Sequence, residues 1–434
     1  MNAIDVEKVD RVYFIGIGGM GMSALAQLFH AEGKEVTGSD REETPMTQLL
    51  RDVGIEIIIG HEEKNIRKDI GLCVVSDAVP KENPEFVHAR TRGIPILTYF
   101  EALGILTKHR FTIAVSGTHG KTTTTGMLTK ILFDAEIEPT AVIGSIVKDF
   151  ESNFVRGGKE PFVVEACEYK DHILKLHPNI LVITNIELDH TDFFKSLEHV
   201  QRTFRKAAES LGESGILIAD PHDPTIKPIL RGLTCTVVDY TKETAGELSF
   251  PAEFNNMNAR AAKAAAKVYA PRLTDISIDV SLELFGGSWR RFEYIGETRK
   301  GALVYDDYAH HPTAIAKTIQ AVREKFADKK ITVVFHPHLY SRTKSFFNEF
   351  ARALSLADYV IVAPIYGARE EKDASISHTL LAQEIKPKRG QAVALDLFDE
   401  IEERLQTMCD DGDIIITMGA GDIYKVANNL TSSL

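Results

Sequence analysis

Residues 111–124 read FTIAVSGTHGKTTT and combine an apolar, β-branched run with a glycine-rich turn and the start of a predicted helix. The apolar run at 111–115 is typical of a strand that is buried on both faces. Gly117 and Gly120 allow backbone N–H groups to face an anion, and the first turn of the following helix adds partial positive charge. This order of strand, turn and helix predicts a phosphate-binding loop in an α/β sheet.

The side chains of this loop predict how it would hold a nucleotide. Lys121 can reach the β- and γ-phosphates, and the Thr122 hydroxyl can ligate Mg²⁺. Only Thr118 and His119 separate Gly117 from the Gly-Lys pair, whereas the usual motif has four residues there, so this is a shortened variant. The alternative interpretation is a tight strand-to-helix turn with an incidental lysine.

Two later segments favour the nucleotide interpretation. Glu165 ends an apolar run that begins at residue 162, and Asp189 and His190 follow the apolar run 180–186. A lone Glu or His is usually an ordinary surface or core residue. At the carboxyl ends of strands beside a phosphate loop, however, carboxylate and imidazole groups are expected Mg²⁺ ligands. The sequence therefore predicts a metal-dependent nucleotide site.

A second glycine-rich loop lies near the amino terminus. Residues 16–21 read GIGGMG, follow the apolar run 12–15 and open a predicted helix, which fits G-x-G-x-x-G. Asp40 ends the next predicted strand, roughly the 20 residues on at which an acid that binds ribose is expected. A nicotinamide cofactor and a nucleotide-diphosphate substrate both satisfy this pattern. Two nucleotide sites in one chain favour an ATP-driven reaction on a nucleotide-linked substrate.

The whole chain has an α/β pattern, because short apolar runs alternate with amphipathic stretches. The clearest runs are residues 12–15, 111–115, 162–164, 180–186, 303–305, 331–335, 359–362 and 414–417. One break falls near Lys108, before the strand of the phosphate loop, and another just after Arg291. We therefore expect three domains, at residues 1–108, 109–291 and 292–434, which suits a length of 434 residues.

Composition excludes several classes of protein. Lys and Arg number 50 against 62 Asp and Glu, so the net charge is −12, and no basic cluster suggests a nucleic-acid partner. No apolar run has the length of a membrane span, and the acidic first ten residues do not resemble a secretory signal. The four cysteines lie far apart. We expect a cytoplasmic monomer or homodimer that acts on small molecules.

Taken together, the motifs resemble those of the Mur ligase family, in order along nearly the whole chain. They are the loop at 16–21, Gly38-Ser39-Asp40, Ser76 to Pro80 with Asn83-Pro84, the loop at 117–123, Glu165-Ala-Cys-Glu168, Thr184-Asn185-Ile186, Asp189-His190, Asn255, Asn258, Arg290-Arg291-Phe292, the DDYAHHP stretch at 306–312, Pro337-His338, Ser341-Arg342-Thr343 and Gly419-Ala-Gly-Asp422. The phosphate loop together with the DDYAHHP stretch is the most specific part of the resemblance.

The resemblance implies a fold and an activity. The fold would comprise a Rossmann-like amino-terminal domain for a UDP-sugar, a central P-loop ATPase-type domain with a parallel sheet, and a Rossmann-like carboxy-terminal domain. The activity would be transfer of the γ-phosphoryl group of ATP to a carboxylate, with Mg²⁺, followed by displacement of phosphate by an amine. Within the family the motifs are most similar to the branch that adds L-alanine to UDP-N-acetylmuramate in peptidoglycan precursor synthesis. Sister ligases carry a carbamylated lysine where residues 202–205 of this chain have none.

The resemblance also implies roles for individual residues. Those that would bind ATP are Gly117, Thr118, His119, Gly120, Lys121, Thr122, Thr123, Asn255, Asn258, Arg291 and Asp307. Those that would bind the UDP-sugar are Gly16, Gly18, Gly19, Met20, Gly21, Ser39, Asp40 and Ser76. Thr122, Glu165 and His190 would hold Mg²⁺. Catalysis would depend on Lys121, Glu165, His190, His310 and Arg342, with His310 and Arg342 placing the amino acid. Simpler roles exist, because Arg291 could be a solvated hinge residue and His310 and His311 could cap a helix that opens at Pro312.

The chain departs from the family pattern at three positions. Phe254 replaces a histidine expected near adenine, Leu339 replaces one of two arginines expected around the amino acid, and Asp77 adds a charge near the sugar nucleotide. Three alternative functions therefore stay open. They are a ligase that attaches a murein tripeptide to the same UDP-sugar, a nicotinamide-dependent oxidoreductase, and a nucleotide sensor without catalysis.

Overall fold

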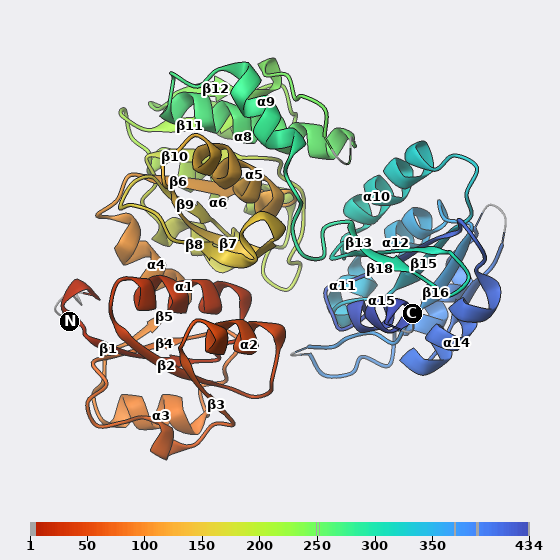
Figure 1. The fold of residues 1–434 in the computed structure, drawn as a ribbon, viewed down its shortest axis with the longest axis horizontal. Coiled ribbons are helices and arrows are strands. Elements are labelled where there is room, and N and C mark those ends of the chain that lie inside the picture. The colour runs from red at the N-terminus through yellow and green to blue at the C-terminus, as the bar shows by residue number, and fades with distance from the viewer. Residues whose placement is uncertain (1–5, 249, 251, 369, 388–389, 433–434) are drawn as a thin grey trace. The chain divides into compact units, whose positions relative to one another are not determined.

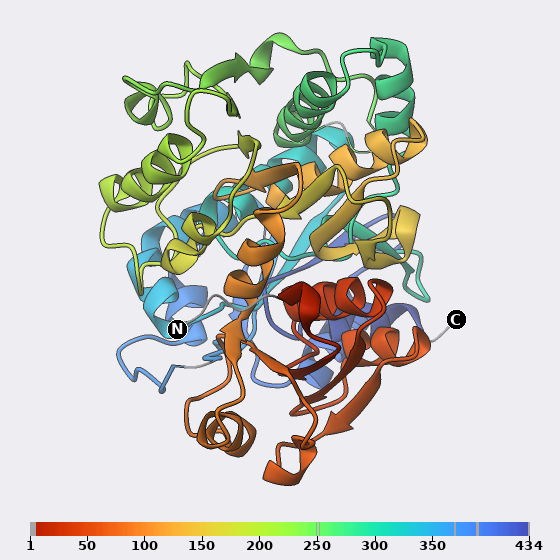
Figure 2. The ribbon, with the colours of Figure 1, turned by 90° about the vertical axis from the view of Figure 1, so that its left-hand side faces the viewer.

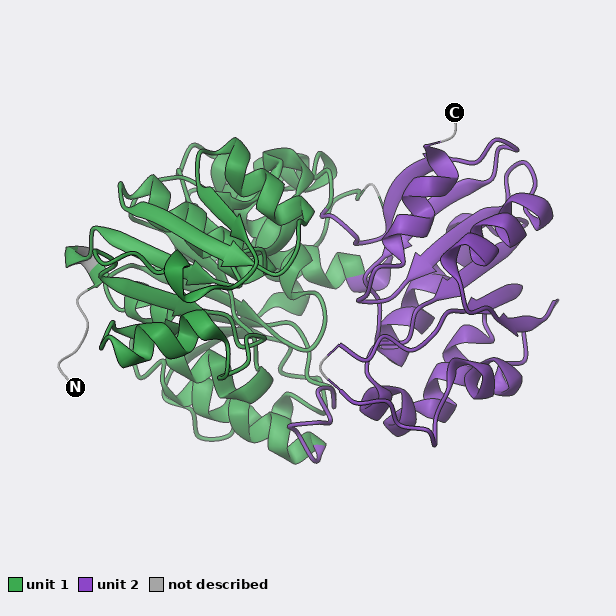
Figure 3. Ribbon diagram, turned by 90° about the horizontal axis from the view of Figure 1, so that it is seen from below, with its two compact units in different colours: residues 1–187, 197–250, 255–287 green, residues 188–196, 251–254, 288–434 purple. Residues whose placement is uncertain are grey.

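The structure is a computed structural model that describes residues 6–248, 250, 252–368, 370–387 and 390–432. The described residues form three sheets of five, seven and six strands, each accompanied by helices (Figure 1). The chain divides into two compact units (Figure 3). Unit 1 comprises residues 1–187, 197–250 and 255–287, and unit 2 comprises residues 188–196, 251–254 and 288–434. Among these residues no helix has both the length and the apolar character needed to cross a bilayer.

The first sheet, in unit 1, is parallel throughout and has the order β3-β2-β1-β4-β5. Its strands are β1 (Arg11–Ile15), β2 (Glu35–Asp40), β3 (Glu56–Ile59), β4 (Leu72–Val75) and β5 (Ile96–Thr98), and its helices are α1 (Met20–Ala31), α2 (Pro45–Asp52), α3 (Pro84–Thr91) and α4 (Tyr99–Thr107). The chain winds outward from β1 to β3 and then resumes at β4 on the other side of β1. The loop that follows β1 therefore lies at a topological switch point, where α/β sheets bind ligands.

The second sheet, also in unit 1, has the order β12-β11-β10-β6-β9-β7-β8. Its strands are β6 (Thr112–Ser116), β7 (Thr140–Val147), β8 (Ser152–Val155), β9 (Phe162–Glu165), β10 (Ile180–Ile183), β11 (Ile216–Ala219) and β12 (Thr236–Asp239). The helices around it are α5 (Lys121–Asp134), α6 (Leu197–Glu209), α7 (Lys227–Leu230), α8 (Glu253–Tyr269) and α9 (Asp275–Glu283). This sheet is mixed, because a short 3₁₀ turn (Lys148–Phe150) lets β8 run antiparallel to β7. The expected parallel arrangement holds for its other strand pairs.

The third sheet, in unit 2, has the order β13-β14-β18-β15-β16-β17. Its strands are β13 (Glu293–Glu297), β14 (Leu303–Asp307), β15 (Ile331–Phe335), β16 (Tyr359–Val362), β17 (Ala392–Ala394) and β18 (Ile414–Met418). Its helices are α10 (Pro312–Lys325), α11 (Tyr340–Ser345), α12 (Phe347–Leu354), α13 (His378–Glu384), α14 (Phe398–Met408) and α15 (Tyr424–Thr431). Only the edge strand β13 is antiparallel to its neighbour among the described strands of this sheet.

All eight predicted apolar runs are strands, and each is parallel to at least one neighbour. The prediction succeeds because these strands, apart from β14 with its half-buried Leu303 and Tyr305, are largely buried on both faces, so their sequences are continuously apolar. β10 ends at Ile183, three residues before the predicted end. Thr184 still donates its N–H to the Ser116 carbonyl of β6, and the side chains of Thr184 and Asn185 bond the phosphate loop.

Within unit 1, α1 packs against the β7–β8 hairpin (Figures 1 and 2). Asn153 of β8 is fully buried there and donates hydrogen bonds to the Met20 carbonyl at 2.7 Å and to the Ser23 hydroxyl at 2.9 Å. Gln27 donates to Asn153 Oδ1 at 2.9 Å. Asn153 therefore ties the helix that follows the first glycine-rich loop to the sheet that carries the phosphate loop.

Candidate active site

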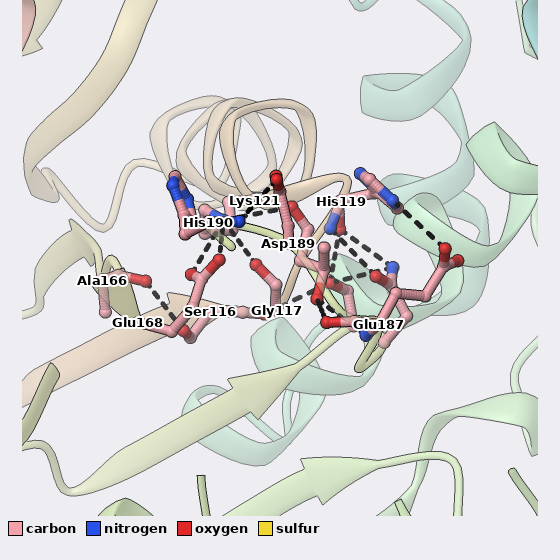
Figure 4. A network of polar contacts seen from close by, with 12 residues as sticks. Ser116, Gly117, His119, Lys121, Ala166, Glu168, Glu187, Asp189 and His190 are labelled. Carbon is pink, nitrogen blue, oxygen red and sulfur yellow. Dashed lines mark hydrogen bonds and ion pairs between the residues drawn. The ribbon is translucent and has the colours of Figure 1, made fainter. Parts of the chain in front are cut away.

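The phosphate loop connects β6 to α5, as predicted (Figure 4). Gly120 has φ +83° and precedes the first residue of α5, and no side chain caps this helix among the described residues. A Cβ atom at Gly120 would lie 2.1 Å from Asn258 Oδ1, so glycine is required for both conformation and space. Asn258 of α8 thus lies against the loop that begins the uncapped helix. An uncapped helix N-terminus suits an anionic phosphate.

Residues that follow β10 hold the loop in shape. The backbone N–H of Thr118 donates to the Asn185 carbonyl at 3.0 Å, and that of His119 donates to Asn185 Oδ1 at 2.9 Å. The His119 carbonyl accepts from Thr184 Oγ1 at 2.6 Å and from Asn185 Nδ2 at 2.9 Å. Four hydrogen bonds with the segment that follows β10 therefore hold the shortened loop in place.

Lys121 is paired within its own loop and with Glu168. Its Nζ donates to the carbonyls of Gly117 at 2.5 Å and Thr118 at 3.2 Å and lies 3.0 Å from Glu168 Oε2 (Figure 4). Burial alone lowers the pKa of Lys121, but the Glu168 carboxylate, with Glu165, raises the pKa above its ordinary value. Lys121 is therefore a charged group. Sequence reasoning assigned no role to Glu168, although its spacing of three residues from Glu165 is visible in the sequence.

Glu165 ends β9 and faces a glycine of the adjacent strand. The backbone N–H of Gly144 donates to Glu165 Oε2 at 2.9 Å. A Cβ atom at Gly144 would lie 2.4 Å from both carboxylate oxygens, so any other residue here would displace the carboxylate. Thr122 is buried in the first turn of α5. The hydroxyl and the carboxylate are oxygen donors of the kind that Mg²⁺ prefers, and both lie in unit 1.

Asn255 and Thr123, also expected at the ATP site, lie near the starts of helices. Asn255 Nδ2 donates to the Phe250 carbonyl at 3.0 Å, which anchors the first turn of α8. Thr123 lies in the first turn of α5. Both positions are in unit 1 together with the phosphate loop.

The first glycine-rich loop lies at the switch point after β1. The Ser39 carbonyl accepts from the N–H groups of Gly16 at 2.9 Å and Ile17 at 3.0 Å. Asp40 Oδ2 accepts from the Gly18 N–H at 2.7 Å. The Asp40 carboxylate thus takes a backbone N–H that could otherwise bind an anion. Gly19 precedes α1, whose N-terminus has no side-chain cap in the described structure. This loop has the features of a second anion-binding turn.

The remaining residues expected at this loop support its conformation and packing. A Cβ atom at Gly21 would lie 2.7 Å from the Tyr99 ring, so this glycine allows α1 to pack closely. The Met20 carbonyl is the acceptor for Asn153. A Cβ atom at Gly16 would lie 3.1 Å from the Ser76 Cβ, so Ser76 borders the loop. Ser39 is fully buried and its hydroxyl donates to Glu85 at 2.5 Å, which gives its side chain a supporting position.

The segment after β10 belongs to unit 2, where it is tied to α11. Asp189 Oδ1 accepts from Arg342 Nη2 at 2.8 Å and Nε at 3.1 Å, and both side chains are buried. Burial alone would raise the pKa of Asp189, but Arg342 and the neighbouring histidines hold the pKa well below its ordinary value. Arg342 Nη1 lies 3.0 Å from His338 Nδ1. The fork that was expected to bind the carboxylate of an amino acid is thus occupied by Asp189.

Two histidines of unit 2, His190 and His310, interact with this ion pair. His190 follows Asp189 with φ +49°, and its N–H donates to Asp189 Oδ1 at 2.6 Å. His310 Nδ1 lies 2.9 Å from the Tyr308 carbonyl, and burial together with Arg342 lowers the pKa of His310 well below its ordinary value. His310 is therefore neutral, with its proton on Nδ1 and a lone pair on Nε2.

The simpler role considered for one histidine is confirmed. His311 precedes α10, and its Nδ1 accepts from the Thr313 N–H at 3.3 Å, so it caps the helix that begins at Pro312. His310 is bonded to a carbonyl and does not cap this helix. The two adjacent histidines have separate tasks.

Asp307 ends β14. Arg291 lies near the start of the longest segment of unit 2, residues 288–434. Asp307 Oδ1 accepts from the Ala309 N–H at 2.7 Å, and Oδ2 accepts from Thr318 Oγ1 at 3.2 Å. Burial raises the pKa of Asp307 to about 6. The Arg291 guanidinium lies 5.1 Å from the centre of the Tyr308 ring. Arg291 is therefore packed on an aromatic face rather than fully solvated.

The departures from the family pattern have local consequences. Leu339 is buried with φ +68° and precedes α11, a conformation that is rare for a residue with a branched side chain. Asp77 lies 3.0 Å from His172 Nε2, across the two sheets of unit 1. The His172 ring is stacked on Phe100 with centroids 4.3 Å apart. Asp77 is thus paired with a histidine of the 3₁₀ segment Tyr169–Lys175.

Three family descriptions match consecutive parts of the chain. "Mur ligase family, catalytic domain" matches residues 11–111, "Mur ligase middle domain" matches residues 115–289, and "Mur ligase, glutamate ligase domain" matches residues 290–421. Together they account for nearly the whole chain.

Curated relatives share the full length of the chain. A UDP-N-acetylmuramate–L-alanine ligase of Agathobacter rectalis is 37% identical, and the alignment covers 99% of each chain. One of Clostridium acetobutylicum is 36% identical, over 99% of this chain and 98% of the relative. The crystal structure of a UDP-N-acetylmuramate–alanine ligase from Thermotoga maritima has a TM-score of 0.81 at 28% identity, over 97% of this chain and 98% of that one. A murein peptide ligase from Psychrobacter arcticus shares the fold, with a TM-score of 0.73 at 24% identity.

Proposed function

This chain belongs to the Mur ligase family, and we propose that it is the ATP-dependent ligase that joins L-alanine to the carboxylate of UDP-N-acetylmuramate. The γ-phosphoryl group of ATP activates the carboxylate as an acyl phosphate, and the amine displaces phosphate to form the amide. The reaction is a step of peptidoglycan precursor synthesis. Its product is needed for cell-wall growth, cell shape and division, and we place the enzyme in the cytoplasm.

One structural observation carries the proposal. Both glycine-rich loops lie in the same compact unit, and each precedes a helix without a side-chain cap in the described structure. A dehydrogenase would need only the loop after β1, whereas a ligase that uses ATP and a UDP-sugar needs two places for phosphates. The direct tie between α1 and β8 through Asn153 supports a common purpose for the two loops.

The phosphate loop would hold ATP by its backbone and by Lys121. The lysine lies among the loop carbonyls, so it can meet the β- and γ-phosphates after giving up its contact with Glu168. The N–H groups at the start of α5, from Lys121 to Thr123, would face the same phosphates. We assign Asn255 and Asn258 to the adenosine end because α8 brings Asn258 against the loop, and Arg291 and Asp307 to the phosphates and the ribose.

The oxygen donors at the loop fit Mg²⁺. Thr122 and Glu165 offer a hydroxyl and a carboxylate, and Gly144 binds Glu165 through one oxygen and leaves the other. When bound, Mg²⁺ would neutralise charge that develops on the transferred phosphoryl group. We assign His190 as a further ligand on the strength of its place after Asp189. Catalysis by the protein then consists of positioning the reactants and stabilising negative charge.

The amino-acid site would lie in unit 2. His310, neutral and with a lone pair on Nε2, can accept a hydrogen bond from the attacking amine. Arg342 is held by Asp189 and His338, so it would place a carboxylate after exchanging one of these partners. The loop at Gly16, Gly18 and Gly19 would hold the diphosphate of the UDP-sugar.

The test is phosphate release from ATP in the presence of Mg²⁺ and UDP-N-acetylmuramate, with L-alanine, glycine, L-serine or murein tripeptide as the amine. We expect release with L-alanine above the others, and a product mass that corresponds to the amide. Preference for the tripeptide would instead assign the recycling reaction. ATP turnover that is indifferent to the UDP-sugar would contradict the proposal.

A further inference from the structure

Glu85, in the first turn of α3, is surrounded by polar groups beside the first sheet. It is completely buried. Its Oε1 accepts from the Tyr13 hydroxyl at 3.0 Å and from Asn65 Nδ2 at 2.7 Å. Its Oε2 accepts from the Ser39 hydroxyl at 2.5 Å and lies 2.9 Å from His61 Nδ1. Tyr13, Asn65 and Ser39 each donate to these two oxygens, so Glu85 acts toward its neighbours as a hydrogen-bond acceptor.

The hydrogen bonds of Glu85 determine the tautomer of the His61 ring. Because Glu85 accepts from its three other neighbours, the Nδ1 atom that faces it at 2.9 Å is the donor of this contact and carries a proton. The Ser39 hydroxyl, which lies 3.1 Å from the same nitrogen, has already given its proton to Glu85. In the neutral ring, Nε2 is therefore left with a lone pair and acts as a hydrogen-bond acceptor.

Nε2 is available to a ligand. It lies on the side of the ring away from Nδ1 and therefore away from the buried Glu85. The His61 side chain is 19% exposed, and within the described part of the chain its contacts are those of Nδ1 with Ser39 and Glu85. Glu85 thus fixes the ring, as an outer carboxylate commonly fixes a histidine whose other nitrogen binds a ligand.

His61 also lies at the edge of the sheet where a nucleoside is expected. It follows β3, and the N–H of the preceding Gly60 donates to the Asp40 carbonyl at 2.8 Å. Asp40 ends β2 next to the glycine-rich loop, with Oδ2 on the Gly18 N–H. In a sheet of this kind the diphosphate lies at the glycine-rich loop and the ribose lies at the end of β2. The base attached to that ribose comes next, on the side of β3.

We propose that His61 recognises the base of the UDP-sugar by accepting the N3–H of uracil at Nε2. Uracil carries a proton at N3, whereas cytosine carries a lone pair there, so the fixed acceptor attracts the first base and repels the second. The inference rests on the proposed function in taking a uridine diphosphate as the ligand of this loop. It makes His61 a specificity-determining residue and Glu85 its positioning residue.

The test compares the binding of UDP and CDP by calorimetry in the wild type and in His61→Ala. We expect the wild type to bind UDP about tenfold tighter than CDP or better, as one satisfied hydrogen bond against one mismatched pair implies. In His61→Ala the preference should fall below about threefold, through weaker binding of UDP. His61→Gln, whose amide contains both a donor and an acceptor, should recover part of the preference. His30→Ala, an exposed histidine at the end of α1, is the matched control.

The outcomes separate recognition from a purely structural role. If His61→Ala weakens UDP and CDP equally, the ratio stays unchanged and the proposal is overturned, because His61 then only supports the fold. A wild type that does not distinguish the two nucleotides overturns it as well. The measurement needs neither ATP nor the amino acid, so it can succeed where the ligation assay fails, and the two proposals can fail separately.

Discussion

Lys121 Nζ lies 3.0 Å from Glu168 Oε2, so the lysine expected to bind phosphate is already paired with a carboxylate. Both side chains are largely buried. The phosphates of ATP must therefore compete with Glu168 for this lysine. The carboxylate has a second effect, because it keeps a buried lysine protonated before the nucleotide arrives.

The first prediction concerns this protonation. In Glu168→Gln, burial still lowers the pKa of Lys121 while its strongest opposing charge is gone. We expect the alkaline decline of kcat/KM for ATP to move to lower pH. Glu168→Asp, which retains the charge, is the control. Superimposable pH profiles for Glu168→Gln and the wild type would show that Glu168 does not set the charge of Lys121.

The second prediction concerns the space around Glu165. In Gly144→Ala the added Cβ would lie 2.4 Å from both Glu165 oxygens, so the carboxylate must move. We expect the apparent KM for Mg²⁺ to rise and kcat to fall by about 100-fold, as for other losses of charge stabilisation at a reacting phosphate. Gly158→Ala, where the nearest atoms lie 3.8 Å away, is the matched control and should stay active. Full activity of Gly144→Ala would remove Glu165 from the metal site.

Much of the fold could be predicted because the central strands of its sheets are buried on both faces and therefore continuously apolar. The β7–β8 hairpin escaped prediction because Gly144 and Ser145 interrupt the apolar pattern of β7. Glycine is present there for the sake of Glu165, which is remote in sequence. A local sequence pattern cannot show a requirement that is set by a residue distant in the sequence.

The candidate site was predicted less completely. The residues of the two loops follow from spacing, because each loop is a local structure. The partners of the charged residues do not, since Glu168 and Asp189 gain their roles from tertiary contacts with Lys121 and Arg342. For the same reason, the sequence could not show that Asp189 competes with the amino acid for Arg342.

The third prediction concerns the link between the two loops of unit 1. Asn153→Ala removes the donor to the Met20 carbonyl and, of the two acceptors of the buried Gln27 Nε2, the nearer one. We expect a loss of about 2 kcal/mol in unfolding free energy and a higher KM for UDP-N-acetylmuramate with an unchanged KM for ATP. Ser152→Ala, which loses a bond to Gln27 at the margin of this contact, should have a smaller effect on both. Equal changes in the two KM values would argue against a specific tie to the first loop.

The fourth prediction concerns the Asp189–Arg342 pair. Asp189→Asn leaves the buried Arg342 guanidinium without its carboxylate, which typically costs about 3–5 kcal/mol. We expect a clearly lower midpoint of denaturant unfolding. Asp192→Asn, a few residues along the same segment, is the comparison variant. A midpoint within error of the wild type would mean that Arg342 finds another partner.

The last prediction concerns pH and Asp307. Burial raises the pKa of this carboxyl to about 6 in the folded protein, above the ordinary value of 3.8. A raised pKa means that the folded state favours the protonated form. The contribution of Asp307 to stability is therefore complete below pH 3.8 and is lost as the pH rises through 6. The difference of 6 − 3.8, or about 2 pKa units, corresponds to about 3 kcal/mol.

Asp307→Asn tests this sign, since its amide can keep the bonds to Ala309 and Thr318 and does not titrate. Unfolding of the two proteins would be compared at several pH values between 4 and 7.5. We expect the variant to gain stability relative to the wild type as the pH rises. If the difference between the two stays constant across this range, Asp307 titrates at its ordinary pKa, and its burial must be offset by Arg291 and the hydrogen bonds that it accepts.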